Sequence, residues 1–127
     1  DHPLDPERKY LEHCSLEGPE AADSYRGEAR LLDGVATVVL PDYFEALVRP
    51  ETRTVQLTPK LEGREPVSLL AASSVEGGRF TVKAIDSHNP SQAFYWEVKA
   101  VRADIERLQV EVPKPEKAVR PADAGSP

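Results

Sequence analysis

The residues with the greatest potential for chemistry in this sequence are one cysteine and three histidines. Cys14 is the only cysteine and directly follows His13, so the pair contains a thiol nucleophile and a base that could activate it. Neighbouring residues on a strand point to opposite faces, so this pair could not hydrogen-bond as a catalytic pair does. The other histidines, His2 and His88, do not provide the short ligand spacing of a zinc site. The sequence therefore predicts neither a cysteine nucleophile nor a bound metal.

Carboxylates are the second group that could carry out chemistry. Glu17 and Glu20 lie on either side of a Gly-Pro turn, and two carboxyl groups roughly 5–9.5 Å apart can hydrolyse glycosidic bonds. Acid–base catalysis also needs a pocket that shifts a pKa, and acidic surface turns are common. The sequence contains no glycine-rich phosphate loop, nucleophile-elbow serine or helix with two histidines. We therefore predict no enzymatic activity and no cofactor.

The aromatic run Phe94-Tyr95-Trp96 is the main candidate for binding. Alternation along a strand sends Phe94 and Trp96 to one face and Tyr95 to the other. We predict that Phe94 and Trp96 lie in the core. Tyr95 is either a partly covered surface residue or part of a protein or glycan contact, where aromatic residues are enriched. Tyr43 is a second candidate for such a contact.

The charge and composition of the chain bear on its partners. The 127 residues carry a net charge of −6 at pH 7, and basic residues alternate with acidic ones, whereas a nucleic-acid surface needs clustered lysine and arginine. The sequence has no signal peptide and no apolar run near the roughly 18 residues that a membrane span needs. We therefore expect no nucleic-acid partner and no membrane insertion. Because the chain starts at Asp1, we expect a fragment or a processed product.

The elements that must position these residues follow mainly from period-2 alternation. In residues 25–31 the odd positions are apolar or small and the even positions are charged, which is typical of a strand with one buried face. Asp33-Gly34 follows and supplies the positive φ angles of a type I′ turn. The apolar and β-branched residues 35–40 come next. We predict a β-hairpin with Asp33 and Gly34 at its tip.

Prolines and glycines separate the remaining short elements. Residues 41–47 predict a single helical turn that Asp42 can cap and that Pro50 ends. Residues 76–78 predict a turn, and residues 86–91 predict a loop. Further strands are predicted at residues 54–58, 67–71, 80–84, 94–101 and 108–112.

This order of short strands predicts an all-β fold. The spacing favours a small antiparallel β-sandwich or a partly open barrel with one short helical turn, formed by residues 1–112. Residues 113–127 have prolines every few positions and little to bury, so they are predicted to form a disordered C-terminal tail.

Six stretches occur in a distinctive order along the chain. They are residues 1–6, 17–20, 25–28, 40–47, 56–59 and 96–98, with the sequences DHPLDP, EGPE, YRGE, LPDYFEAL, QLTP and WEV. In this order they resemble a terminal module of phage tail-fibre and tail-spike-like proteins and of related uncharacterised bacterial surface proteins. The resemblance covers roughly residues 1–112. It implies an extended, β-rich, trimeric parent protein at a virion or extracellular surface, and it assigns no catalytic residue.

Two classes of function are compatible with these observations. The first is a structural or adhesive module of a trimeric fibre that contacts a neighbouring subunit, a host-surface receptor or a glycan. The second is a secreted carbohydrate-binding or enzyme-accessory β-domain. Threefold self-association would favour the first class. A row of exposed aromatic residues on one flat face, beside an acidic cleft, would favour the second.

Overall fold

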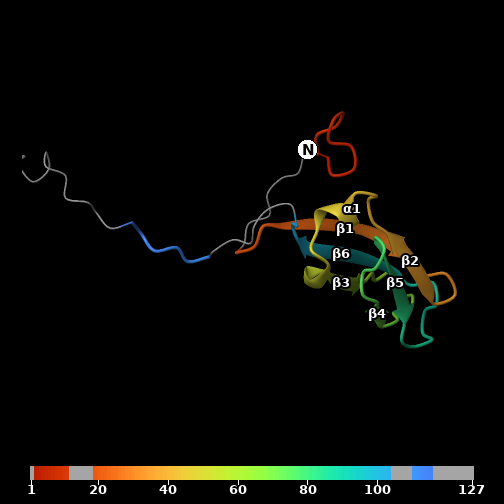
Figure 1. Ribbon diagram of the computed structural model, residues 1–127. Helices are drawn as coiled ribbons and strands as arrows, with labels where there is room; N and C mark the ends of the chain where they lie inside the picture. The colour runs from red at the N-terminus through yellow and green to blue at the C-terminus, as the bar shows by residue number, and fades with distance from the viewer. Residues whose placement is uncertain (1, 12–18, 104–109, 116–127) are drawn as a thin grey trace, which may run out of the picture.

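The computed structural model describes residues 2–11, 19–103 and 110–115 of the chain. These residues form a β-sandwich of two three-stranded antiparallel sheets (Figure 1). The predicted all-β sandwich is confirmed, and the described residues form no closed barrel.

In each sheet the central strand is the last of its three strands along the chain. Sheet A has the strand order β1–β6–β3, and sheet B has the order β2–β5–β4. The strands are β1 (Ala22–Arg30), β2 (Val35–Val39), β3 (Thr54–Pro59), β4 (Leu70–Ala72), β5 (Arg79–Ala84) and β6 (Ala93–Val101). A short helix, α1 (Phe44–Leu47), and a 3-10 turn, η1 (Pro50–Thr52), connect β2 to β3.

The core lies between the two sheets and under α1. Its largest side chains are Phe44 of α1, Phe80 of β5 and Phe94 of β6, all of which are almost fully buried. Val82 of β5 and Val98 of β6 belong to the same cluster and are equally buried. Burying an apolar side chain of this size contributes about 1.5–3 kcal/mol. The inward positions of residues 94–101 are therefore as the alternation predicts.

The Asp33-Gly34 turn forms as predicted, but the long hairpin around it does not. Asp33 and Gly34 have φ angles of 53° and 82°, and Leu32 and Val35 exchange two backbone hydrogen bonds of 2.9 and 3.2 Å. Beyond this pair the chain segments separate, because β1 pairs with β6 and β2 pairs with β5. All nine residues of β1 find partners along β6, which is a longer ladder than the five residues of β2 could provide.

The predicted helical turn is confirmed, and its ends differ from the prediction. α1 begins at Phe44 after an N-cap at Tyr43, and no side chain caps it. Asp42 is therefore not the capping residue. Pro50 lies beyond the helix and begins η1, where its fixed φ angle suits the first position of a turn.

The strand predicted at residues 67–71 is shorter and starts later than expected. The backbone N–H of Ser68 donates to the Gln92 side chain, at 2.9 Å, and the N–H of Leu69 donates to the Asp86 carboxylate, at 3.0 Å. Side chains thus accept the two backbone hydrogen bonds that a neighbouring strand would otherwise have accepted. β4 begins only at the next residue.

The predicted strand at residues 108–112 is not formed by the part that the structure describes. Residues 110–112 belong to no strand, and Val110 and Val112 are 70% and 66% exposed. Residues 108 and 109 lie outside the described residues, as do residues 116–127 of the predicted tail. Residues 113–115, the described part of the tail, are exposed.

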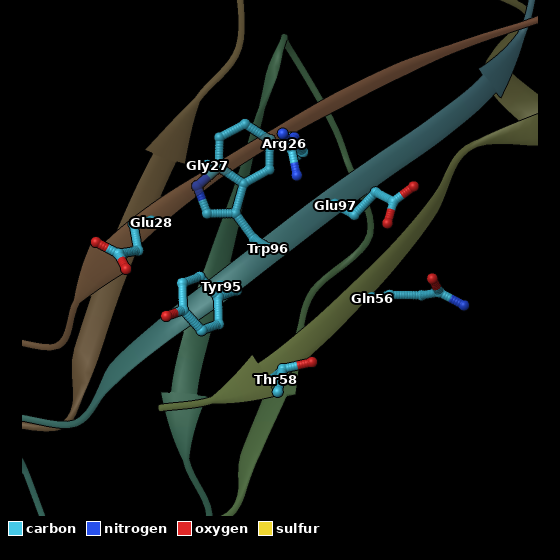
Figure 2. A pocket seen from close by; sticks show the side chains of 8 residues that line it. All are labelled: Arg26, Gly27, Glu28, Gln56, Thr58, Tyr95, Trp96 and Glu97. Carbon is cyan, nitrogen blue, oxygen red and sulfur yellow. The ribbon is translucent and has the colours of Figure 1, made fainter. Parts of the chain in front are cut away.

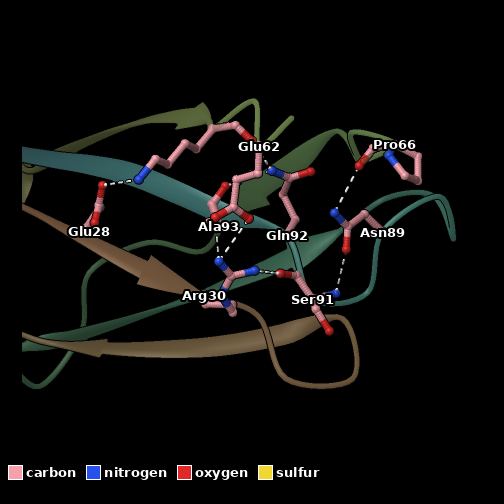
Figure 3. Close-up of polar contacts among 9 residues, drawn as sticks. Glu28, Arg30, Glu62, Pro66, Asn89, Ser91, Gln92 and Ala93 are labelled. Atoms are coloured by element: carbon pink, nitrogen blue, oxygen red, sulfur yellow. Dashed lines mark hydrogen bonds and ion pairs between the residues drawn. The ribbon is translucent and has the colours of Figure 1, made fainter. Parts of the chain in front are cut away.

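The buried side chain of Gln92 connects the loops at one end of the sandwich (Figure 3). Its Oε1 accepts the Ser68 hydrogen bond, and its Nε2 donates to the carbonyls of Lys60 and Ala93, both at 2.8 Å. Its backbone carbonyl accepts from the N–H of Leu31 at 2.9 Å. One residue therefore holds the end of β1, the end of β3 and the approach to β4 against the start of β6.

We expect Gln92→Leu to lower the free energy of unfolding by about 2–4 kcal/mol, because it leaves the Ser68 N–H and the Lys60 carbonyl without their partner. Gln56→Leu is the matched control, since Gln56 is exposed on β3, and surface changes are usually within about 0.5 kcal/mol. Urea denaturation measures both. A loss below about 1 kcal/mol for Gln92→Leu would show that the loops are held by other contacts.

Asp86 fastens the loop between β5 and β6. Its carboxylate accepts hydrogen bonds of 3.0 Å from the backbone N–H groups of Leu69 and His88. Together with a hydrogen bond from the Ser68 hydroxyl, these bonds lower the pKa of Asp86 from 3.8 to about 2. The ionised form is favoured in the folded protein because each of these donors stabilises the negative charge.

A carboxylate whose pKa is lower in the folded protein than in the unfolded chain stabilises the fold at pH values above its unfolded pKa. This stabilisation is lost as the pH falls through the folded pKa. We therefore expect part of the acid-induced loss of thermal stability between pH 3.8 and about 2 to come from Asp86. Asp86→Asn should lower the melting temperature at pH 7 and flatten the curve in that window. Asp42→Asn, at an exposed carboxylate, is the control. If the melting temperatures of wild type and Asp86→Asn fell equally between pH 3.8 and about 2, this role would be contradicted.

Candidate functional site

The outer face of sheet A contains a hollow of about 460 Å³ (Figure 2). Pockets of roughly 300–1,000 Å³ are typical of small-ligand sites. We call this feature the outer hollow. It is lined by Arg26, Gly27 and Glu28 of β1, by Gln56 and Thr58 of β3, and by Tyr95, Trp96 and Glu97 of β6.

Strand register places the outer side chains in two rows across the sheet. One row joins Arg26 to Glu97 and Gln56, which are direct partners across the three strands. The second row joins Glu28 to Tyr95 and Thr58. Directly opposite residues on one sheet face lie within side-chain contact distance, so each row forms a continuous polar strip.

Tyr95 lies at the centre of the second row and is 46% exposed. The ammonium group of Lys60 lies 5.6 Å from the centre of its ring, which is within range of a cation–π contact. Lys60 also forms an ion pair of 3.1 Å with Glu28, and this hydrogen bond raises the pKa of the lysine. The ring of Tyr95 is thus held beside a fixed positive charge.

The first row contains one engaged carboxylate and two uncommitted side chains. Glu97 accepts from Lys99 and from the Ser24 hydroxyl, both at 3.2 Å. The side chains of Arg26 and Gln56 have no hydrogen bond or ion pair with any described residue. Both groups can therefore donate to a ligand without giving up an existing contact.

A strong ion pair lies beside the hollow, at the end of β1 (Figure 3). Arg30 donates to both carboxylate oxygens of Glu62, at 2.9 and 2.7 Å, and to the carbonyl of Ser91 at 2.8 Å. These bonds lower the pKa of Glu62. One guanidinium nitrogen of Arg30 thus contacts both carboxylate oxygens and another contacts the Ser91 carbonyl, so this rim of the hollow is already committed to structure.

The floor of the hollow depends on Gly27 and Trp96, which face each other across β1 and β6. A Cβ atom on Gly27 would lie only 2.8 Å from two ring carbons of Trp96, so only glycine lets the indole lie this close to the strand. The other side of the indole meets Phe80 of sheet B, with ring centres 5.8 Å apart. Trp96 is half-buried against the core, and Phe94 is fully buried, as predicted.

The two tyrosines selected from the sequence lie in different places. Tyr43 is half-buried beside Tyr25, with ring centres 6.4 Å apart, and its ring meets that of His2 at 5.4 Å. Burial raises the pKa of Tyr25 and of Tyr43. Tyr25 packs against the core, so Tyr43 lies on the inner side of sheet A, whereas Tyr95 is on its outer side. The structure does not bring them into one site.

The remaining sequence candidates provide no second site. His13, Cys14 and Glu17 lie outside the described residues, and Glu20 is exposed. Across residues 2–11, 19–103 and 110–115, no group of three or more His, Cys, Asp or Glu side chains could hold a metal ion. Within the same ranges, no helix has the length and apolar character needed to span a membrane.

Sequence reasoning identified Tyr95 but missed its neighbours. The alternation in residues 25–31 already placed Arg26 and Glu28 on the wet face, but it could not show which strand pairs with β1. The pairing of β6 with both β1 and β3 brings Gln56, Thr58 and Lys60 to the same face. Long-range register, which no local pattern encodes, was the missing information.

Comparison of the chain with protein-family models, with curated proteins and with solved structures gave no match. The resemblance of residues 1–112 to phage tail-fibre modules therefore stays a prediction. The function of the outer hollow is inferred below from its own residues and geometry.

We expect Gly27→Ala to lower the free energy of unfolding by about 1–3 kcal/mol, the usual cost of overpacking. The added methyl group would displace the Trp96 indole, which is the chain's single tryptophan, so intrinsic fluorescence should change as well. In a Trp96→Leu background the same substitution should cost much less. If the effects of Gly27→Ala and Trp96→Leu on the free energy of unfolding add within about 0.5 kcal/mol, the two residues do not act through one contact.

Proposed function

We propose that this chain is a non-catalytic structural and adhesive module of a trimeric fibre, displayed at a virion or extracellular surface, and that the outer hollow contacts a receptor. The observation that carries the proposal is an exposed aromatic ring, Tyr95, in a hollow that also contains the side chains of Arg26 and Gln56, which have no partner among the described residues. A site built on strands is positioned more firmly than a site on loops.

The charges in the hollow support binding in preference to catalysis. Its two carboxylates, Glu28 and Glu97, each form an ion pair with a lysine. A general acid or base needs a pKa near the working pH, which burial or a like charge would produce. In the hollow, both carboxylates are already engaged by an ammonium group. These residues are better suited to hydrogen-bonding with a ligand.

The chemistry of the hollow suits a polar receptor such as a surface glycan. The Tyr95 ring offers an amphipathic face, and Arg26, Gln56 and Thr58 surround it with hydrogen-bonding groups. A free-standing carbohydrate-binding domain would be favoured by a row of exposed aromatic rings. Among the described residues, Tyr95 is the one aromatic side chain exposed on this face, so the fibre module is the better-supported function.

Trimeric assembly is supported by the resemblance of residues 1–112 to fibre modules and by the open edges of the two sheets. Within the described residues, β1 and β3 are edge strands of sheet A, and β2 and β4 are edge strands of sheet B. Exposed edges promote unwanted pairing, and packing between subunits is one way to cover them. Threefold symmetry would also present three copies of the hollow around one fibre axis.

The assembly is tested by light scattering on the full-length parent protein and on this chain. We expect the parent to be trimeric, and the chain at high concentration to approach three times its 14.0 kDa mass. A monomeric parent would overturn the proposal. So would hydrolysis of a glycan by this domain that disappears on Glu17→Gln or Glu20→Gln.

The receptor contact is tested by binding to an array of bacterial surface polysaccharides. Tyr95→Ala should weaken binding at least tenfold without a loss of thermal stability, because the ring is exposed on the outer face. Thr37→Ala, at an exposed position of β2 on the other sheet, is the matched control and should bind as wild type does. Equal binding by wild type and Tyr95→Ala would place the contact elsewhere on the chain.

A further inference from the structure

One positive charge in the outer hollow has no counter-charge within the described part of the chain. The charged side chains that line the hollow are Arg26, Glu28 and Glu97. Glu28 forms an ion pair of 3.1 Å with Lys60, and Glu97 forms one of 3.2 Å with Lys99. Arg26 has no ion pair or hydrogen bond with any described residue. Its guanidinium is therefore the charged group of the hollow that is available to an anionic ligand.

The carboxylate nearest to Arg26 in the strand register is held on the far side of its row. Glu97 is the direct cross-strand partner of Arg26, but its Oε1 accepts from the Ser24 hydroxyl and the Lys99 ammonium, both at 3.2 Å. Ser24 and Lys99 form the next row of the sheet, on the side away from Tyr95. Figure 2 shows the Glu97 carboxylate directed away from the Tyr95 ring. It therefore does not lie between Arg26 and Tyr95.

The Tyr95 ring bounds the other end of this space. Arg26 on β1 and Gln56 on β3 are both diagonal neighbours of Tyr95, and diagonal neighbours on one sheet face lie roughly 7–8 Å apart. Lys60 comes after Thr58 along the chain, whereas Gln56 comes before it. The Lys60 ammonium thus reaches the Tyr95 ring from the side away from Gln56. The side of the ring toward Arg26 and Gln56 is left for a ligand.

These groups match a sugar ring that carries a carboxylate. The amphipathic ring of Tyr95 can pack against the apolar C–H face of a sugar, and the Gln56 amide can bond to its hydroxyl groups. The guanidinium of Arg26 can hold a carboxylate through two parallel hydrogen bonds. A neutral sugar would not use the charge of Arg26. An acidic peptide would bind best at an open strand edge, whereas the hollow lies on the face of sheet A.

We propose that the outer hollow selects acidic saccharides, with a sugar carboxylate bound to Arg26 and the sugar ring packed against Tyr95. This inference rests on the proposed receptor contact and names the chemical class of the receptor. The chain as a whole has a net charge of −6 and repels anionic polymers. A local cation that is not neutralised by its neighbours is therefore needed where such a polymer binds.

Reducing the carboxylates of a bound polysaccharide to primary alcohols tests the class of ligand, because it removes the charge and keeps the sugar linkages. The strongest-binding carboxylated polysaccharide of the array is compared with its reduced form by titration calorimetry. The full chain should bind the reduced form at least tenfold more weakly. Equal affinity for both forms would overturn the proposal and leave the receptor contact standing. So would an array on which only uncarboxylated polysaccharides bind, or polyglutamate binding as tightly as the polysaccharide. An array without any binder would overturn the receptor contact itself.

Arg26→Gln tests the residue that carries the selectivity. This change should weaken binding of the carboxylated polysaccharide at least fivefold and bring its affinity close to that of the reduced form. Arg79→Gln makes the same change in charge at an exposed position of β5, on the other sheet, and should bind as wild type does. Both arginines are exposed, so unchanged melting temperatures check folding. Equal losses in the two variants, or no loss with Arg26→Gln, would overturn the contact with Arg26.

Discussion

The fold depends most on the buried amide of Gln92, because it satisfies polar groups at both ends of the loop between β3 and β4 and at the start of β6. Its three side-chain hydrogen bonds reach Ser68, Lys60 and Ala93. A buried polar group is costly unless its partners are all in place, so such a cluster allows few alternative arrangements. Apolar contacts such as Phe80 against Trp96 supply stability, but they are less directional. The amide network therefore determines how β6 begins, and β6 in turn orders sheet A.

The position of β6 at the centre of sheet A separates the roles of its two faces. Its inward residues Phe94 and Val98 belong to the core, while Tyr95 and Glu97 line the outer hollow. Because successive residues alternate between faces, binding groups and core groups can change independently. Gly27 and Trp96 are the exception: they contribute to the core and also form the floor of the hollow. A change there affects both stability and the shape of the site.

The sequence was sufficient to predict features with short-range causes and insufficient for those with long-range causes. The Asp33-Gly34 turn, the helical turn near Phe44 and the alternating faces of β1 and β6 all follow from neighbouring residues. The strands on both sides of the turn form, but their pairing with each other was wrong, because β1 and β2 each pair with a strand at least 40 residues away. Leu69 likewise left the predicted strand because the distant Asp86 accepts its N–H. Tyr95 was found by alternation, and its neighbours were not.

The strand predicted at residues 108–112 follows the same logic. Alternation reports that a segment can form a strand, but it does not report where the partner strand is. β1 shows that a local strand signal can be correct while the expected partner is not. Residues 110–112 carry the signal and remain exposed, outside any strand. A local alternating pattern therefore allows a strand, but the strand forms only where the fold provides a partner.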